Sequence, residues 1–548
     1  MYVKNIFPFF CCIFLLAMPA LHAQSTSFVF KPEADDDATP LPPENSTYKA
    51  AYEVYRNLVH ARGDNRFPAP RFEMTGRSKK VAEILYNEPL ILLEEKAYGI
   101  CRSFGPDSTN ALAQLLAHEL THYYEKHGWN LDFSSSFAAS KPIKDSLKVA
   151  LSLLNETQAD YLGGFLAYSA GYDVFEGNSA FLDKVYKTYP LDTLDESTHP
   201  NLAKRRAMTK ASAEKLAELI EIFETANYLA AIGKYADARA FYKNILKTYQ
   251  SREIYNNLGV ITIFEALTYF NESEVKYRLP LQLDLEPRSS KGSGFADTRN
   301  GLLEEAIRYF DSAISLDEDY VPAYLNKACA YTLLEDYERA NFYATREAAQ
   351  RAQNNPAFAK AATDALVLQG IIAARQEDKA KAEAFFGLAI GQGSNLAKYN
   401  KKVLLGIDQG ETESPFSMSA PEKVDDFDLP LFSRSPFGKQ AYTEKVEDKL
   451  MFFEFTAPAP KNSKVLISQY NNGERNAFFH ITGKGYQGKS GRNIKIGDSL
   501  KAVTDAYKEP LRTIELSNGQ LLVYNQVIFR IGMGDKVKSW AVYYSSSR

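Results

Sequence analysis

The chain has 548 residues, of which 45% are hydrophobic and 24% charged, as in an ordinary globular protein with room for three or four domains. The formal net charge is −4 and there is no block of basic residues, which argues against nucleic acid or anionic lipid as the main partner. Cys101 and Cys329 lie beyond the N-terminal segment, and neither has metal-ligand spacing. We expect both to be small buried hydrophobic residues.

The N-terminal residues have the pattern of an export signal. Lys4 is followed by the apolar run Ile6 to Leu16, and Leu21-His22-Ala23 offers a cleavage site before Gln24. The run is short for a membrane span, and no other run is long enough to be one. We therefore expect residues 1–23 to be a signal peptide, whose removal leaves an exported protein without an integral membrane span. An uncleaved anchor is the alternative.

A linker and then a first globular domain are expected next. Residues 24–45 combine prolines with three successive aspartates, which is typical of a mobile linker. The domain over 46–212 begins with a helical pattern and short β-rich runs. We expect two long helices to follow, over about 110–128 and 144–170.

The first of these helices carries the most informative motif of the chain, the sequence HELTH at residues 118–122. Four residues are just over one helical turn, so His118 and His122 lie on one face of the helix. Two imidazoles in this arrangement can hold one Zn²⁺, and Glu119 can act as general base toward an attacking water. A catalytic zinc ion normally needs a third protein ligand.

The second long helix supplies a candidate for this ligand in the sequence NETQAD at residues 155–160. Glu156 can bind zinc through a carboxylate oxygen. Asp160 lies one turn further on the same face and can accept the second N–H of a ligating histidine, which orients the ring. The alternative is that Glu156 and Asp160 form a solvated polar face.

Three successive segments, HELTHYYEKH, NETQADYLG and STHPNLAKR, resemble the signatures of the M48 zinc metallopeptidases. The resemblance implies that His118, His122 and Glu156 bind the zinc ion and that Glu119 is the general base. It also implies that His199 and Arg205 belong to a loop element close to the metal.

Several roles near the motif stay open. His199 could donate a hydrogen bond to the oxyanion, occupy the fourth zinc position, or bind backbone at the start of a helix. Arg205 could pair with a carboxylate near the cleft or lie on the surface. We expect His127 to stabilise the helix C-terminus as a partly charged residue and do not count it as a ligand.

Residues 213–400 have the pattern of tetratricopeptide-like repeats, interrupted by an insertion over 270–300. In this pattern a small residue of one helix is followed 12 positions later by a second small residue and then by an aromatic. The pattern is met by Ala226, Ala238 and Tyr242, by Gly370, Ala382 and Phe386, and by Ala328 and Ala340 with Tyr337 before the latter. Ala306, Phe310 and Ala313 fit a second helix whose first helix carries Gly259 and lies before the insertion. The alternative is generic helical packing.

A second linker over 410–425 leads into a β-rich domain over 426–548. Asn518-Gly519 between two β-like runs predicts a hairpin, residues 498–507 predict a short helix, and His480 is expected to be a packed strand residue. The predicted fold is therefore multidomain. It comprises an α+β zincin-like (gluzincin) peptidase domain, an all-α tetratricopeptide-like solenoid and a β-rich α+β domain at the C-terminus.

An M48-like domain followed by such repeats resembles the periplasmic β-barrel assembly-enhancing proteases. The resemblance implies a zinc endopeptidase in the periplasm or cell envelope of a Gram-negative-type bacterium, with the repeats recruiting protein clients or outer-membrane assembly partners. We expect a substrate peptide to add to an edge strand near Leu90 to Glu95. The alternative is a non-catalytic scaffold with a vestigial or structural metal site.

Overall fold

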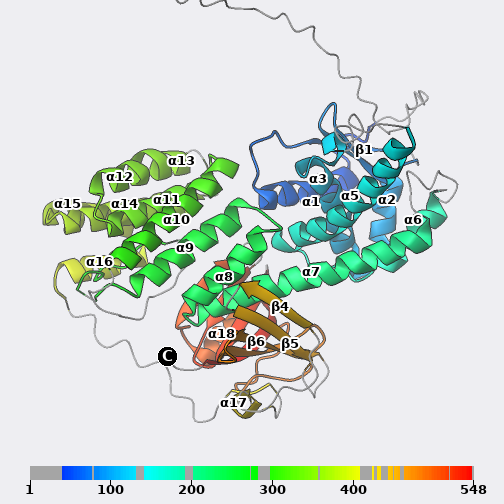
Figure 1. Ribbon diagram of the computed structural model, residues 1–548. Coiled ribbons are helices and arrows are strands. Elements are labelled where there is room, and N and C mark those ends of the chain that lie inside the picture. The colour runs from blue at the N-terminus through cyan, green and yellow to red at the C-terminus, as the bar shows by residue number, and fades with distance from the viewer. Residues whose placement is uncertain are drawn as a thin grey trace, which may run out of the picture.

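The computed structural model shows three parts, an N-terminal part with a small sheet, a stack of helices, and a C-terminal sheet that lies below α7 and α8 (Figure 1). The predicted signal peptide, most of the linker before residue 45 and most of the second linker lie outside the described residues. The residues that the structure describes are 40–76, 79–130, 141–189, 191, 201–271, 273–281, 296–353, 355, 358–407, 422–424, 427, 429–432, 442–447, 450–456, 462–516, 519–532 and 534–545.

The N-terminal part packs helices around a three-stranded sheet with the order β1-β3-β2. Strand β3 pairs with β1 in parallel and with β2 in antiparallel orientation, so it is the central strand. The expectation of an edge strand near Leu90 to Glu95 is therefore wrong, because both sides of β3 are already hydrogen-bonded. The elements are α1 (Ser46–Arg62), β1 (Arg71–Thr75), β2 (Ala82–Leu85), β3 (Leu90–Glu94), α2 (Glu95–Arg102), α3 (Ser108–Tyr124), α5 (Lys141–Ser169) and α6 (Asn178–Thr188).

Helices α3 and α5 pack closely, and their contact brings the two predicted motif segments together. A Cβ atom on Gly163 would lie 2.9 Å from the backbone carbonyl carbon of Ala117 and 2.9 Å from the backbone nitrogen of His118. Glycine thus permits a backbone approach that a larger residue would prevent. The buried side chains of Leu116, Leu120 and Phe165 fill the adjoining core.

The helices from α7 onward pack mainly against their neighbours along the chain. The small and aromatic residues singled out in the sequence lie in the core, except Tyr337, which is partly buried and packs against it; Ala226, Ala328 and Phe386 are fully buried. Helix α7 runs without a break through the expected domain boundary at 212/213. The elements are α7 (Leu202–Ala231), α8 (Tyr235–Leu246), α9 (Arg252–Leu267), α10 (Ala296–Leu316), α11 (Val321–Leu333), α12 (Tyr337–Phe342), a π-helical stretch (Tyr343–Ala349), α13 (Gln350–Gln353), α14 (Ala359–Arg375), α15 (Lys379–Gly391) and α16 (Asn395–Leu404).

Glycines mark two of the crossings between paired helices. A Cβ atom on Gly259 of α9 would lie 2.4 Å from the ring of Phe310 in α10, and one on Gly370 of α14 would lie 2.5 Å from the ring of Phe386 in α15. In each pair, an aromatic ring of the second helix therefore fills the space that the missing side chain leaves on the first. The predicted spacing of small and aromatic residues corresponds to this packing.

The C-terminal part is an eight-stranded antiparallel sheet with the order β4-β5-β6-β7-β11-β10-β9-β8. Strands β8 and β9 form the hairpin predicted around Asn518-Gly519, and α18 is the predicted short helix. The elements are α17 (Leu429–Phe432), β4 (Tyr442–Glu447), β5 (Leu450–Thr456), β6 (Ser463–Tyr470), β7 (Arg475–Thr482), α18 (Leu500–Tyr507), β8 (Arg512–Leu516), β9 (Gly519–Val523), β10 (Val527–Gly532) and β11 (Lys536–Ser545).

Both faces of this sheet are covered, because successive side chains of a strand point to opposite faces. Phe479 of β7 belongs to the large core that includes α7 and α8, and its ring stacks on Tyr228 of α7 at 5.4 Å between centroids. The adjacent Phe478 belongs to a separate core with Val503 and Tyr507 of α18. The sheet is thus a layer between the helices of the stack and its own short helix.

Ion pairs join the C-terminal sheet to α7 and to the N-terminal part. Arg530 of β10 pairs with Glu224 of α7, and the hydroxyl of Tyr168 in α5 donates to the same Glu224 carboxylate at 2.6 Å. Lys538 of β11 pairs with Asp173 at 3.0 Å. The end of the helix that carries Glu156 is therefore in contact with the C-terminal sheet.

A second junction joins α1 to the helical stack. The guanidinium of Arg252 at the start of α9 pairs with Asp317 and donates to the backbone carbonyl of His60 at 2.9 Å. The Asn65 side chain donates to Asp317 at 2.9 Å. Arg252 and Asp317 are both buried, so this junction excludes most solvent.

No helix of the described part of the chain is long and apolar enough to cross a membrane.

Candidate metal centre

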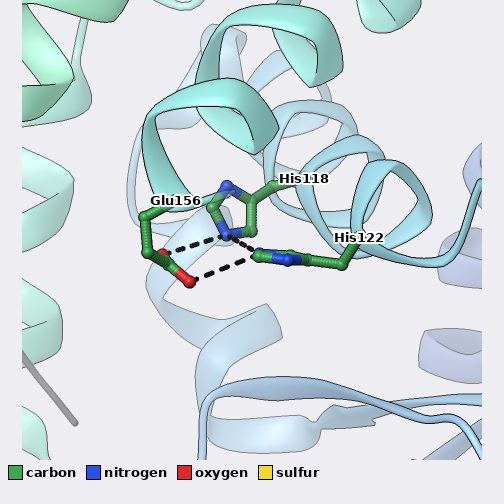
Figure 2. Close-up of side chains that lie close together, drawn as sticks. All are labelled: His118, His122 and Glu156. Carbon is green, nitrogen blue, oxygen red and sulfur yellow. Dashed lines mark hydrogen bonds and ion pairs between the residues drawn. The ribbon is translucent and has the colours of Figure 1, made fainter. Parts of the chain in front are cut away.

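Two histidines of α3 and one glutamate of α5 form a compact group of possible metal ligands. Figure 2 shows His118, His122 and Glu156 pointing toward one another. The Nε2 atoms of the two histidines lie 3.0 Å apart. Glu156 places one carboxylate oxygen 3.5 Å from Nε2 of His118 and the other 3.4 Å from Nε2 of His122. The structure thus brings the three predicted ligands together.

These distances fit a tetrahedral zinc ion. Zinc bonds to nitrogen and oxygen of about 2.0–2.1 Å at tetrahedral angles place two ligand atoms about 3.3 Å apart. The two Nε2 atoms lie 3.0 Å apart and each is 3.4–3.5 Å from one of the two Glu156 oxygens, close to this spacing. One donor atom from each residue lies within 4.8 Å of the other two. Two imidazoles and one carboxylate are also the donor set of several catalytic zinc sites. Among the described residues, this is the one such group of three.

Asp160 supports His118 from the side opposite the ligand atom. Its Oδ1 lies 2.9 Å from Nδ1 of His118, which directs Nε2 toward the group. Asp160 is itself fixed by Arg205, whose Nη1 and Nη2 lie 2.5 and 2.7 Å from its two carboxylate oxygens, and by the Thr209 hydroxyl at 2.9 Å. Of the two possibilities left open for Arg205, the structure shows pairing with a carboxylate. The polar-face alternative for Glu156 and Asp160 does not describe these largely buried contacts.

His127 lies against His122, and sequence reasoning missed this contact. Helix α3 ends at Tyr124 rather than near residue 128, and Lys126 has a φ of 57°, in the left-handed region. The chain therefore turns back, and Nδ1 of His127 lies 2.9 Å from Nδ1 of His122. Its Nε2 lies 3.3 Å from Oε1 of Gln158 in α5.

The expected helix-end charge on His127 is wrong. Its side chain is buried, and burial lowers its pKa to about 4, so the ring is neutral at pH 7. In an unbroken helix, a residue five positions after His122 would point away from it. The signal in the sequence is the third histidine of HELTHYYEKH, but helical spacing assigns it to the helix end and not to His122.

Burial and close charges set the electrostatics of the group. Burial alone would lower the pKa of His118, but its hydrogen bonds with Asp160 and Glu156 outweigh this effect and raise the pKa to about 10. Burial also lowers the pKa of His122, to about 3. For Glu156, burial favours the neutral acid, but His118 and the other nearby cationic groups hold its pKa well below the usual value. Glu156 is therefore an anionic oxygen donor at neutral pH.

Glu119 lies on α3 beside the ligand group but has a different environment. Burial raises the pKa of its carboxyl to about 7, and the negative charge of Glu156 adds to this effect, while His118 opposes it. A carboxylate with a pKa near 7 is suited to accept and return a proton at neutral pH.

His199 lies outside the described residues, so its three possible roles stay predictions. Tyr86, at the end of β2, lies next to this group. Its ring packs against Gly128, and its hydroxyl lies 3.5 Å from the backbone carbonyl of His122.

A scan against protein-family models and a search of curated proteins found no match to this chain.

Proposed function

We propose that this chain is a zinc-dependent endopeptidase. The observation that supports the proposal best is the geometry of His118, His122 and Glu156, which offer two imidazole nitrogens 3.0 Å apart and a carboxylate oxygen within 4.8 Å of both, the donor set of a catalytic zinc site. The partially buried Glu119 beside them supplies the base that hydrolysis needs, whereas a purely structural zinc site has no use for one. The M48-like order of the three sequence segments points to the same reaction.

The residues have distinct roles in the proposed reaction. A zinc ion held by the three ligands supplies Lewis acidity, which activates water and polarises the scissile carbonyl. The Glu119 carboxylate takes the proton from the attacking water and passes it to the leaving amine, a role that suits its pKa of about 7. Asp160, fixed by Arg205, holds the His118 ring in the orientation that binding requires.

Substrate would approach along the edge of the small sheet. Strand β2 is an edge strand and packs against α3, whereas the outer side of β1 is bridged to Pro40 near residue 75. A peptide paired with β2 would lie beside the ligand-bearing helix and would be recognised mainly through its backbone. This edge replaces the one expected near Leu90 to Glu95, and it favours unfolded or misassembled protein as substrate.

We also propose that the N-terminal part is a gluzincin-like domain and that the helix pairs from α7 to α16 are tetratricopeptide-like repeats. The glycine–phenylalanine contacts between α9 and α10 and between α14 and α15 support the repeat assignment. Such repeats would bind clients or envelope assembly partners. The corresponding location is the periplasm or cell envelope.

One experiment separates the peptidase from a non-catalytic scaffold. Zinc content and the cleavage of casein, an unfolded protein, are measured for the wild-type protein and for Glu119→Gln, with and without chelator. We expect one zinc ion per chain in both proteins, and a cleavage rate that falls about 10²- to 10⁴-fold in the variant. Equal cleavage by both proteins, or none by wild type with zinc fully bound, would refute the proposal.

A further inference from the structure

The two histidine ligands have outer partners of different chemistry. Nδ1 of His118 faces the carboxylate of Asp160 at 2.9 Å. Nδ1 of His122 instead faces another imidazole nitrogen, Nδ1 of His127, at 2.9 Å. The second nitrogen of His127 faces the amide oxygen of Gln158 at 3.3 Å. An anion thus supports one ligand, whereas the other is followed by a chain of neutral groups.

Binding of a metal ion fixes the direction of every hydrogen bond in this chain. Nε2 of His122 faces the ligand group, so its lone pair is used for the metal and the ring proton must be on Nδ1. Nδ1–H of His122 then donates to Nδ1 of His127, which has to be an acceptor. The proton of His127 is consequently on Nε2, from which it donates to Oε1 of Gln158. Both hydrogen bonds are thus satisfied without a charge on any of the three side chains.

We propose that His127 is a positioning residue for the metal ligand His122, and that His122, His127 and Gln158 form a neutral hydrogen-bond relay that fixes the ring and tautomer of this ligand. The inference rests on the proposed metal site. The turn at Lys126 is part of the relay, because its left-handed conformation brings His127 back toward α3. Since His127 is 2% exposed, water cannot readily replace it as the partner of His122.

The relay also predicts that the two histidine ligands differ in basicity. A carboxylate partner makes His118 the more basic donor, whereas a neutral imidazole adds less electron density to His122. The orientation of His122 therefore depends on the shape and acceptor position of His127 rather than on charge.

The test compares zinc affinities of the full chain, measured by competition with a chromophoric chelator. His127→Phe keeps a ring but removes both nitrogens, and we expect affinity to fall about 10- to 100-fold. His127→Asn keeps an acceptor close to the position of Nδ1 and should recover most of this loss. His480→Phe is the matched control, because His480 is equally buried but lies in the C-terminal sheet, and it should bind zinc as wild type does.

A purely structural role for His127 predicts a different pattern. His127→Phe would then change the unfolding of the zinc-free protein but leave zinc affinity unchanged, and this result would overturn the relay while the proposed function stands. If His127→Phe does not fold, Gln158→Met decides the matter, because it removes the acceptor for His127 at a partly exposed position and should also weaken zinc binding. Unchanged affinity in Gln158→Met would likewise overturn it, and a wild-type protein that binds no zinc would overturn both proposals.

Discussion

The substitution Gly163→Ala tests whether the close contact of α3 and α5 sets the geometry of the metal centre. The new Cβ atom would lie 2.9 Å from two backbone atoms of α3, Ala117 C and His118 N. Backbone cannot rotate away as a side chain can, so the helices must separate by about 0.5 Å to restore an ordinary van der Waals contact. Such overpacking costs about 1–3 kcal/mol.

A gain in helix propensity of about 1 kcal/mol offsets part of this cost, since alanine replaces glycine within a helix. Gly387→Ala in α15 isolates that gain, because a Cβ atom there would meet nothing within 4 Å. We therefore expect the free energy of unfolding of the Gly163→Ala protein, measured without zinc by chemical denaturation, to be about 1–3 kcal/mol lower than that of Gly387→Ala.

The same shift should weaken metal binding. His118 lies on α3 and Glu156 on α5, and a movement of about 0.5 Å exceeds the tolerance of about 0.2 Å in metal–ligand distances. We expect zinc affinity to fall at least about tenfold in Gly163→Ala and to stay unchanged in Gly387→Ala. If the two variants were equally stable and bound zinc equally well, the reasoning from the helix contact would be refuted.

Two further predictions concern buried polar groups outside the site. Arg252→Met leaves Asp317 buried without its cation and should lower the free energy of unfolding by about 3 kcal/mol. The control Lys501→Met breaks an exposed pair with Asp505 and should lower it by less than about 1 kcal/mol. Equal effects of the two variants in denaturant titrations would contradict this. Burial lowers the pKa of His480 to about 4, so below pH 6.5 the unfolded chain binds a proton that the folded sheet excludes. Stability that is complete above pH 6.5 should therefore fall as the pH approaches 4, by up to about 3 kcal/mol, and His480→Phe should remove this loss; an unchanged pH profile in the variant would show that other groups cause it.

Local spacing predicted the elements that carry the site. The four-residue step from His118 to His122 and the step from Glu156 to Asp160 depend only on helical geometry, and both helices are present. The buried state of His480, Cys101 and Cys329 and the hairpin at Gly519 also agree with the sequence-based expectation.

The errors in prediction concern contacts that depend on the rest of the molecule. Lysine has no preference for the left-handed conformation that Lys126 adopts, so the end of α3 and the contact of His127 with His122 could not be predicted. Likewise, the apolar run of β3 suits an edge strand and a central strand equally well. Only the pairing with β1 on one side and β2 on the other distinguishes them.

The carboxylate of Glu224 is shared by Tyr168 of α5 and Arg530 of β10, which are far apart in the sequence. A polypeptide grows from its N-terminus, so α5 and α7 are synthesised some 300 residues before Arg530. Until then, the Glu224 carboxylate lacks its cation and the helix face that receives the sheet is uncovered. Contacts between residues so far apart in sequence also form late and slowly during folding. The helix that carries Glu156 therefore reaches its final packing only when the last strands of the chain have been made.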